Sequence, residues 1–270
     1  MNVVLSRHQF VADYAEAGAG PLAVLVHASM SGARQWGALT QALAGRFRVR
    51  ALNLFGYGRT PAWTGTLEPT LDDYADLVLS AIPADADGVA LIGHSFGGAV
   101  AMQAARRLGA RAVQLVLIEP SIFSLLSLCG HGEAFAEISA VAEDMARLHA
   151  EAAAERFIGY WTGPASWAAT PPERRAAYVR GVDLVRREFK AALEAPVPLK
   201  AWRDALPRRT LVLSAAGTTR PSREVVQLLA LAGAGWEFAH VPEGAHMSPL
   251  THPHLVNPLI AAFLGRPERR

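Results

Sequence analysis

Residues 89–107 read VALIGHSFGGAVAMQAARR, and the architecture of the chain can be worked out from this segment outward. Its first four residues form a short apolar run, typical of a strand that is buried on both faces. A G-x-S-x-G pentapeptide from Gly93 to Gly97 follows, and the alanine-rich run after it has a helical pattern. The segment therefore predicts a sharp strand-to-helix turn that raises the Ser95 hydroxyl above the carboxyl edge of a sheet.

Short apolar runs and helical patterns alternate on both sides of this turn. Further strand-like runs lie at 21–29, 46–56, 113–120, 209–217 and 236–244, and a looser alternation at 3–18 predicts an antiparallel edge pair. Helical patterns lie at 71–82, 96–109 and 223–233, and a last helix ends at 265. Thr70 and Gly109 are placed to cap two of these helices. The pattern predicts an α/β fold with a doubly wound, mainly parallel eight-stranded sheet.

The strand pattern is interrupted once, between residues 121 and 206. Alanine, arginine, glutamate and scattered aromatic residues dominate there, with prolines as breakers. This texture predicts a helical cap inserted into the sheet domain. The core domain is then expected at 1–120 and 207–270, and the cap at 121–206.

Composition restricts the partners and cofactors. The 270 residues are 51% hydrophobic and carry a net charge of only +2, so neither disorder nor a nucleic-acid-binding stripe is expected. The single cysteine, Cys129, rules out an intramolecular disulfide and a cysteine-based zinc cluster. No signal-peptide pattern and no apolar run of about 18 residues is present. We expect a cytoplasmic protein with no membrane partner, no metal and no organic cofactor, and the oligomeric state stays open.

Four motifs together indicate a family. Besides the Ser95 turn, residues 25–29 (LVHAS) look like an oxyanion loop, 53–60 (NLFGYGRT) like the loop after the next strand, and 242–253 (PEGAHMSPLTHP) like a histidine loop. On these residues the chain resembles the α/β-hydrolase superfamily, in its capped single-domain branch, over essentially its whole length. The resemblance implies a serine hydrolase that acts on an ester, thioester or lactone-type acyl bond of a small, largely apolar substrate.

The resemblance assigns roles to individual residues. Ser95 is the expected nucleophile, and His246 is the expected general base because it satisfies the chain order serine, acid, histidine. The backbone N–H groups of Ser29 and Phe96 are the expected oxyanion donors. Ala28 stands where the family usually has glycine.

The triad acid departs from the family pattern. In most relatives it follows the next-to-last strand, but here that loop, residues 214–222, has no carboxylate. Asp204 precedes the strand and Glu224 lies in the helix after the loop. Glu119 ends the strand that follows the nucleophile strand, a position from which some haloalkane dehalogenases of this superfamily take their acid. We therefore predict that Glu119 orients His246.

The substrate remains open at this stage. Met30 and the cap residues Phe157, Trp161 and Trp167 are predicted to line the substrate pocket. A serine nucleophile argues against dehalogenase and epoxide-hydrolase chemistry, whose relatives use aspartate. A carbon–carbon bond hydrolase, an acyltransferase and a non-catalytic ligand-binding protein on the same scaffold remain as alternatives.

Overall fold

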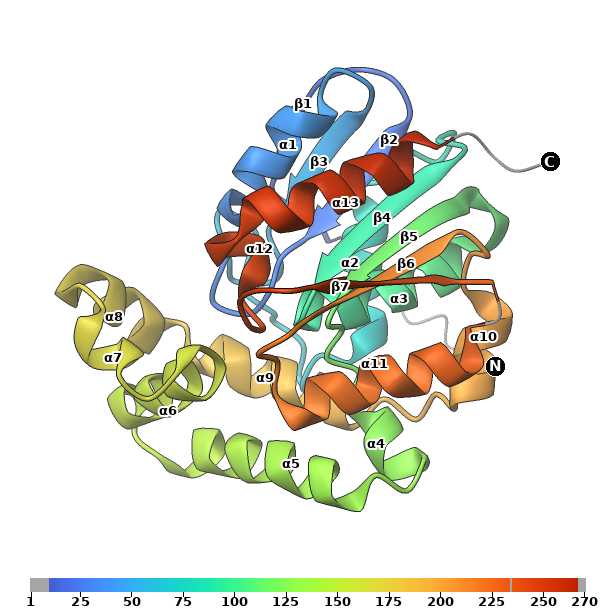
Figure 1. Ribbon diagram of the computed structural model, residues 1–270. Coiled ribbons are helices and arrows are strands. Elements are labelled where there is room, and N and C mark those ends of the chain that lie inside the picture. Colours follow the sequence, from blue (N-terminus) through green and yellow to red (C-terminus); the bar gives the residue numbers. More distant parts are fainter. Residues whose placement is uncertain (1–9, 234, 267–270) are drawn as a thin grey trace, which may run out of the picture.

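The computed structural model describes residues 10–233 and 235–266. In these residues seven strands form one sheet, in the order β1-β3-β2-β4-β5-β6-β7 (Figure 1). Strand β1 is antiparallel to β3, and the other neighbours are parallel. The strands are β1 (Tyr14–Ala17), β2 (Leu22–Val26), β3 (Arg48–Leu52), β4 (Val89–His94), β5 (Ala112–Ile118), β6 (Thr210–Ala215) and β7 (Glu237–Val241).

The predicted α/β fold with a mainly parallel sheet is confirmed, but the described strands number seven and not eight. The difference lies in the predicted edge pair at 3–18, of which only β1 is a strand. Residues 1–9, which include most of the other predicted strand, lie outside the described residues. Before β1 the chain is irregular, and the Asp13 carboxylate accepts hydrogen bonds from the side chains of Asn53 and Arg59.

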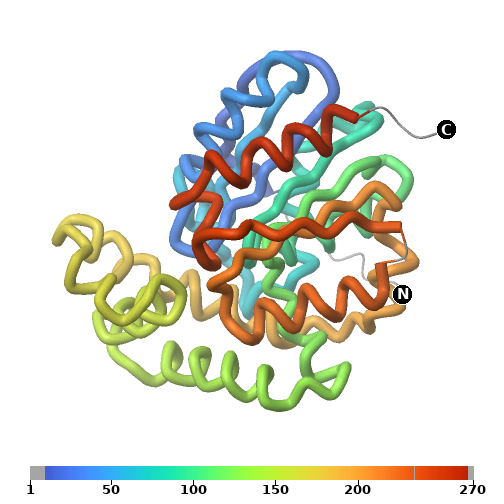
Figure 2. Tube along the Cα trace, viewed as in Figure 1, coloured from blue at the N-terminus to red at the C-terminus, as the bar shows by residue number. Residues whose placement is uncertain are grey.

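Helices cover both faces of the sheet. On one face α1 and α13 lie side by side although they come from opposite ends of the chain (Figure 2). On the other face α2, α3 and α11 bury their apolar sides in the larger of two hydrophobic clusters. The helices of the core are α1 (Gly37–Leu43), α2 (Leu71–Ser80), α3 (Phe96–Leu108), α11 (Arg220–Ala232), α12 (Ser248–Thr251) and α13 (Pro253–Gly265), with short 3₁₀ turns at Ala33–Trp36 and Gly109–Arg111.

Local signals fix the ends of two core helices. The Thr70 hydroxyl accepts from the backbone N–H of Asp73, whose carboxylate accepts in turn from the Thr70 N–H, a capping box at the start of α2. Helix α3 ends at Leu108, and Gly109 follows with a φ of 56°. Both predicted caps are confirmed.

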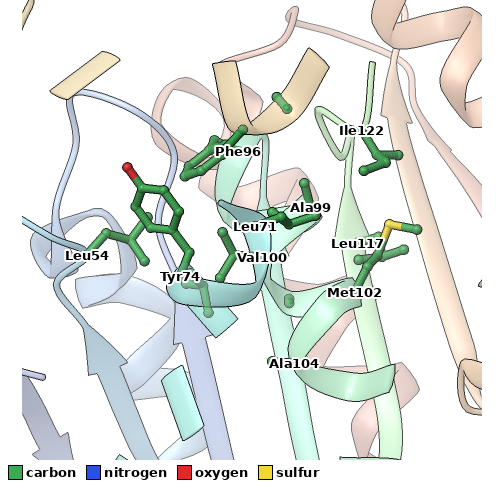
Figure 3. Close-up of a cluster of buried hydrophobic side chains, with 14 of the residues drawn as sticks. Leu54, Leu71, Tyr74, Phe96, Ala99, Val100, Met102, Ala104, Leu117 and Ile122 are labelled. Atoms are coloured by element: carbon green, nitrogen blue, oxygen red, sulfur yellow. The ribbon is translucent and has the colours of Figure 1, made fainter. Parts of the chain in front are cut away.

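Packing anchors the helix that follows the Ser95 turn. The Phe96 ring contacts Tyr74 of α2 edge to face, with ring centroids 4.8 Å apart, and Val100 belongs to the same buried cluster (Figure 3). All three side chains are buried. Burying an aromatic or large aliphatic side chain stabilises the fold by about 1.5–3 kcal/mol, so the first turn of α3 is held firmly against the sheet.

Seven helices connect β5 to β6. They are α4 (Ser124–Leu128), α5 (Gly132–Arg147), α6 (Ala150–Thr162), α7 (Ser166–Ala169), α8 (Pro172–Arg180), α9 (Val182–Leu193) and α10 (Leu199–Ala205). Helices α5 to α8 project beyond the carboxyl edge of the sheet (Figure 1), and these helices are called the cap below. Helix α10 instead packs against α3 and α11 and buries Trp202 completely. No helix among residues 10–233 and 235–266 has the length and apolar character needed to cross a membrane.

Candidate active site

Ser95 occupies the sharp turn between β4 and α3. Its φ of 56° lies in the left-handed region, a strained conformation for a residue with a side chain. The flanking glycines make the turn possible. A Cβ on Gly93 would lie 2.3 Å from the carbonyl oxygen of Gly97, and a Cβ on Gly97 would lie 2.3 Å from the carbonyl oxygen of His27.

Three side chains form a continuous hydrogen-bonded chain at this turn. The Ser95 hydroxyl lies 2.8 Å from Nε2 of His246, and Nδ1 of His246 lies 2.7 Å from Oε2 of Glu119. Ser95 is 7% exposed, His246 2% and Glu119 1%, so water has little access to these three side chains. If His246 carries its proton on Nδ1, Nε2 can accept the serine proton and the carboxylate accepts from Nδ1–H.

Both oxygens of the Glu119 carboxylate accept further hydrogen bonds. The Ala215 N–H donates to Oε1 at 2.7 Å, and the Thr218 hydroxyl donates to Oε2 at 2.6 Å. Burial raises the pKa of Glu119, but the hydrogen bonds from His246, Thr218 and Ala215 outweigh it and leave the pKa below its ordinary value. Glu119 is therefore an anion at neutral pH. Its φ of 43° shows that the backbone is bent sharply at the end of β5.

Asp204 and Glu224, the other two carboxylates near this part of the sequence, do not reach His246 and form ion pairs with other residues. Asp204 forms ion pairs with Lys200 and Arg203 on the surface. Glu224 lies 2.7 Å from Nδ1 of His131 at the base of the cap. Neither contacts His246.

His94 supports the loop that carries His246. Its ring points away from the serine, as expected, and its Nε2–H donates to the carbonyl oxygen of His246 at 2.8 Å. The Gln35 amide donates to Nδ1 of His94 at 3.0 Å and accepts from the Ala28 N–H at 3.0 Å. Burial lowers the pKa of His94 to about 3, so the ring is neutral. Gln35, which the sequence did not single out, thus ties the histidine loop to the loop that precedes Ser29.

The expected oxyanion donors, Ser29 and Phe96, line one small cavity together with Ser95. Phe96 is the first residue of α3, so its N–H has no acceptor within the helix. The loop around Ser29 is held by His27, which donates from Nδ1 to the Ala28 carbonyl at 2.7 Å and accepts from a backbone N–H at Nε2. The next residue, Met30, has a φ of 58°, and its N–H donates to the hydroxyl of Tyr57 at 2.9 Å.

A second hydroxyl lies beside that of Ser95. Oγ of Ser121 is 3.1 Å from Oγ of Ser95, and the Ser121 N–H donates to the carbonyl oxygen of Ser95 at 2.9 Å. Sequence inspection gave no reason to select Ser121. It is close to Ser95 because the chain bends directly after β5.

A large cleft between core and cap opens onto these groups. It has a volume of about 1230 Å³, and Met30, Phe157 and Trp161 line it together with Ser95 and His246. The Trp161 indole stacks on the His246 ring, with centroids 4.1 Å apart and planes at 28°.

Trp167 does not join the other predicted pocket residues. It lines neither this cleft nor the small cavity beside Ser95. Its side chain is buried in the apolar interior of the cap, and the Arg175 guanidinium covers its ring at 5.9 Å. An aromatic residue of a cap helix is thus core here, because α7 turns its apolar side toward α6.

Comparison with known proteins supports the fold and the family. A pimeloyl-[acyl-carrier protein] methyl ester esterase of Aromatoleum aromaticum is 41% identical over 101 residues, which cover 37% of this chain and only 38% of the relative. Lipase LipV of Mycobacterium tuberculosis is 29% identical over 262 residues, which cover 91% of this chain and 94% of the lipase. A crystal structure of a hydrolase from Pseudomonas aeruginosa PA01 superposes with a TM-score of 0.75 at 25% identity, covering 94% of both chains. The alpha/beta hydrolase family matches residues 23–259, so the chain belongs to this family.

Proposed function

We propose that the protein hydrolyses a carboxylic ester, thioester or lactone of a small, largely apolar substrate through an acyl-enzyme on Ser95. The observation that carries this proposal is the hydrogen-bonded chain Ser95–His246–Glu119, buried at the foot of a cleft. A serine hydroxyl is a weak nucleophile, and an adjacent base held in the correct tautomer by an anion is what activates it. Relatives named as esterases and a lipase support the same class of reaction.

The first half of the reaction acylates the serine. The Ser95 hydroxyl gives its proton to Nε2 of His246 while Oγ attacks the carbonyl carbon. The tetrahedral oxyanion accepts hydrogen bonds from the N–H groups of Ser29 and Phe96, which need no reorganisation. His246 then protonates the leaving oxygen or sulfur, and the carbonyl bond re-forms as the leaving group departs.

The second half repeats these steps with water. Water gives a proton to Nε2 of His246 and attacks the acyl-enzyme, and the acid product leaves as the proton returns to Ser95. Throughout both halves the Glu119 anion stabilises the imidazolium, which forms in each transition state. The three hydrogen bonds to this carboxylate keep it fixed while the charge on His246 changes.

Fluorophosphonate labelling tests whether Ser95 is activated. The wild-type protein should gain one label, found by mass spectrometry on the peptide that contains Ser95, and Ser95→Ala should gain none. Ser121→Ala is the matched control, because it removes the neighbouring hydroxyl but leaves the contact between Ser95 and His246, and it should still be labelled. An unlabelled wild-type protein would favour the ligand-binding alternative. Label on another serine would contradict the site.

A further inference from the structure

Two cavities of very different size meet at Ser95. The cleft of about 1230 Å³ has His246 in its wall. A second cavity of about 20 Å³ also borders Ser95, with Phe96 and Glu188 in its wall and without His246. Ser29, Ser95, Phe157 and Trp161 border both cavities.

The chemistry of the proposed reaction assigns one half of the substrate to each cavity. His246 must reach the leaving group in order to protonate it, so the leaving group occupies the cleft that His246 lines. The acyl group then points into the small cavity, on the side of the Phe96 N–H. A cavity of this size holds about one water-sized group, so the acyl chain is short while the leaving group can be large.

Glu188 brings an unpaired carboxyl to this small cavity. It lies on the apolar side of α9, is 1% exposed, and neither of its oxygens has a hydrogen-bonding partner among the described residues. The hydroxyls of Ser29 and Tyr57 face it without reaching hydrogen-bonding geometry. The neighbouring Arg187 supplies no counter-ion, because its guanidinium pairs with Glu68 at 3.0 Å.

A buried carboxyl without a hydrogen-bond donor lowers the stability of the folded protein, which points to a function for Glu188. A buried carboxyl without a donor loses its hydration and gains nothing in return. Burial raises the pKa of Glu188 to about 7, against a smaller lowering from Ser29 and Tyr57, so both protonation states are present near neutral pH. Either state accepts a hydrogen bond from a hydroxyl, and the anion also pairs with an ammonium group.

The remaining wall of the small cavity is almost entirely apolar and aromatic. It is formed by Ser121 and by the apolar residues Phe123, Phe157, Trp161, Phe189 and Ala192. A donor that enters here finds the Glu188 carboxyl as its acceptor beside the serine hydroxyls. Aromatic faces additionally attract an ammonium group.

We propose that Glu188 makes the enzyme selective for short acyl groups that carry a hydrogen-bond donor, a hydroxyl or an ammonium group, near the reacting carbonyl. This inference rests on the proposed function, since it assigns the acyl half of the same substrate. The hydroxyl or ammonium group of the substrate donates the hydrogen bond that the Glu188 carboxyl lacks, whereas an apolar acyl group of equal size leaves this carboxyl unpaired.

Three benzyl esters of equal heavy-atom count test the proposal: those of hydroxyacetic, aminoacetic and propanoic acid, called here the hydroxy, amino and methyl esters. Their acyl groups differ only in the group on the carbon next to the carbonyl, so each places one such group in the small cavity. Wild-type kcat/KM for the hydroxy and amino esters should exceed that for the methyl ester about 10- to 100-fold, the usual effect of leaving a buried acceptor unpaired. Equal rates, or a preference for the methyl ester, would refute the proposal.

Variants of Glu188 separate recognition from a merely structural role. Glu188→Leu should reverse the order in favour of the methyl ester, and Glu188→Gln should keep the hydroxy preference and lose the amino preference, because an amide accepts a hydrogen bond without charge. Glu194→Gln, on an exposed glutamate at the end of the same helix, should change nothing. An equal loss for all three esters in Glu188→Leu and Glu188→Gln would overturn the proposal.

A binding measurement keeps this test separate from the test of the proposed function. Calorimetry with Ser95→Ala gives the Kd of each intact ester without turnover, and the same 10- to 100-fold order is expected. If the wild-type protein is neither labelled nor active but Ser95→Ala still discriminates, the proposed reaction fails and the selectivity of Glu188 stands. Equal Kd values refute the selectivity even if hydrolysis is found.

Discussion

Replacing Glu119 by glutamine changes one atom of the side chain and tests the proposed triad most directly. The two oxygens of Glu119 are not equivalent in their partners. Oε1 accepts from the backbone N–H of Ala215, whereas Oε2 accepts from Thr218 and His246. A backbone N–H cannot turn away, but a hydroxyl can rotate. The amide oxygen of glutamine must therefore face Ala215, and the amide nitrogen must face His246.

That orientation removes two contributions at once. The imidazolium loses an anion whose charge centre lies about 4 Å away, an interaction of about 4 kcal/mol at an effective dielectric constant of 20. This alone corresponds to about 10³ in rate. The amide N–H also donates to Nδ1 of His246 and places the ring proton on Nε2, where it cannot accept the serine proton. Together the two effects should lower kcat about 10³- to 10⁴-fold, as in other triads.

The assay is steady-state hydrolysis of an ester together with the rate of fluorophosphonate labelling. Both should fall by similar factors in Glu119→Gln, while the melting temperature shows that the protein is folded. Glu224→Gln and Asp204→Asn are the matched controls, because both carboxylates pair elsewhere, and they should stay within a few-fold of wild type. If Glu119→Gln keeps more than a tenth of the wild-type kcat, the anion is not needed and the proposed triad is wrong.

Three further outcomes are expected. Adding Thr218→Asp to Glu119→Gln should recover kcat about tenfold, since an anion returns near the imidazolium at a longer distance; no recovery would mean that the loop cannot place it. Trp161→Leu should lower kcat about 3- to 30-fold by removing the indole stacked on the His246 imidazolium, with Trp167→Leu as the control that leaves kcat unchanged. The free energy of unfolding should fall as the pH drops from about 6.5 toward 3, because the unfolded chain protonates His94 while the folded protein, with a pKa of about 3, does not. When the free energy of unfolding is measured with urea at several pH values, its slope against pH should be about 1.4 kcal/mol per pH unit smaller in His94→Gln than in the wild type. Equal slopes against pH would contradict this.

The parts of the fold that local sequence determines were predictable. The Ser95 turn, the buried parallel strands and the caps at Thr70 and Gly109 each depend on a few adjacent residues. Strand alternation over 3–18 was a weaker signal, and only β1 formed there among the described residues. Trp167 shows the same limit in the cap, since sequence marks a residue as aromatic but does not say which side of a short helix meets substrate.

The parts of the site that depend on distant residues were not predictable in this way. Gln35 and Tyr57 matter because they reach His94 and the Met30 N–H across the fold, and no local pattern marks them. Glu188 did leave a signal. It follows Val185 by three residues on the apolar side of α9, where a charged side chain is unexpected.

The position of Glu119 is explained by the pairing of two neighbouring strands. Ile118 of β5 pairs with Leu213 of β6, and the Glu119 N–H donates to the Leu213 carbonyl oxygen at 3.0 Å, so both strands end at the same level beside His246. A carboxylate at either strand end can therefore orient the same imidazole. The end of β6 and the loop after it still take part in the site, because the Ala215 N–H and the Thr218 hydroxyl hold the anion that the resemblance would have placed on the loop itself. It follows that Thr218 must remain a donor. Thr218→Val, which keeps the shape and removes the hydroxyl, should raise the pKa of Glu119 and lower kcat, whereas Thr218→Ser should preserve both.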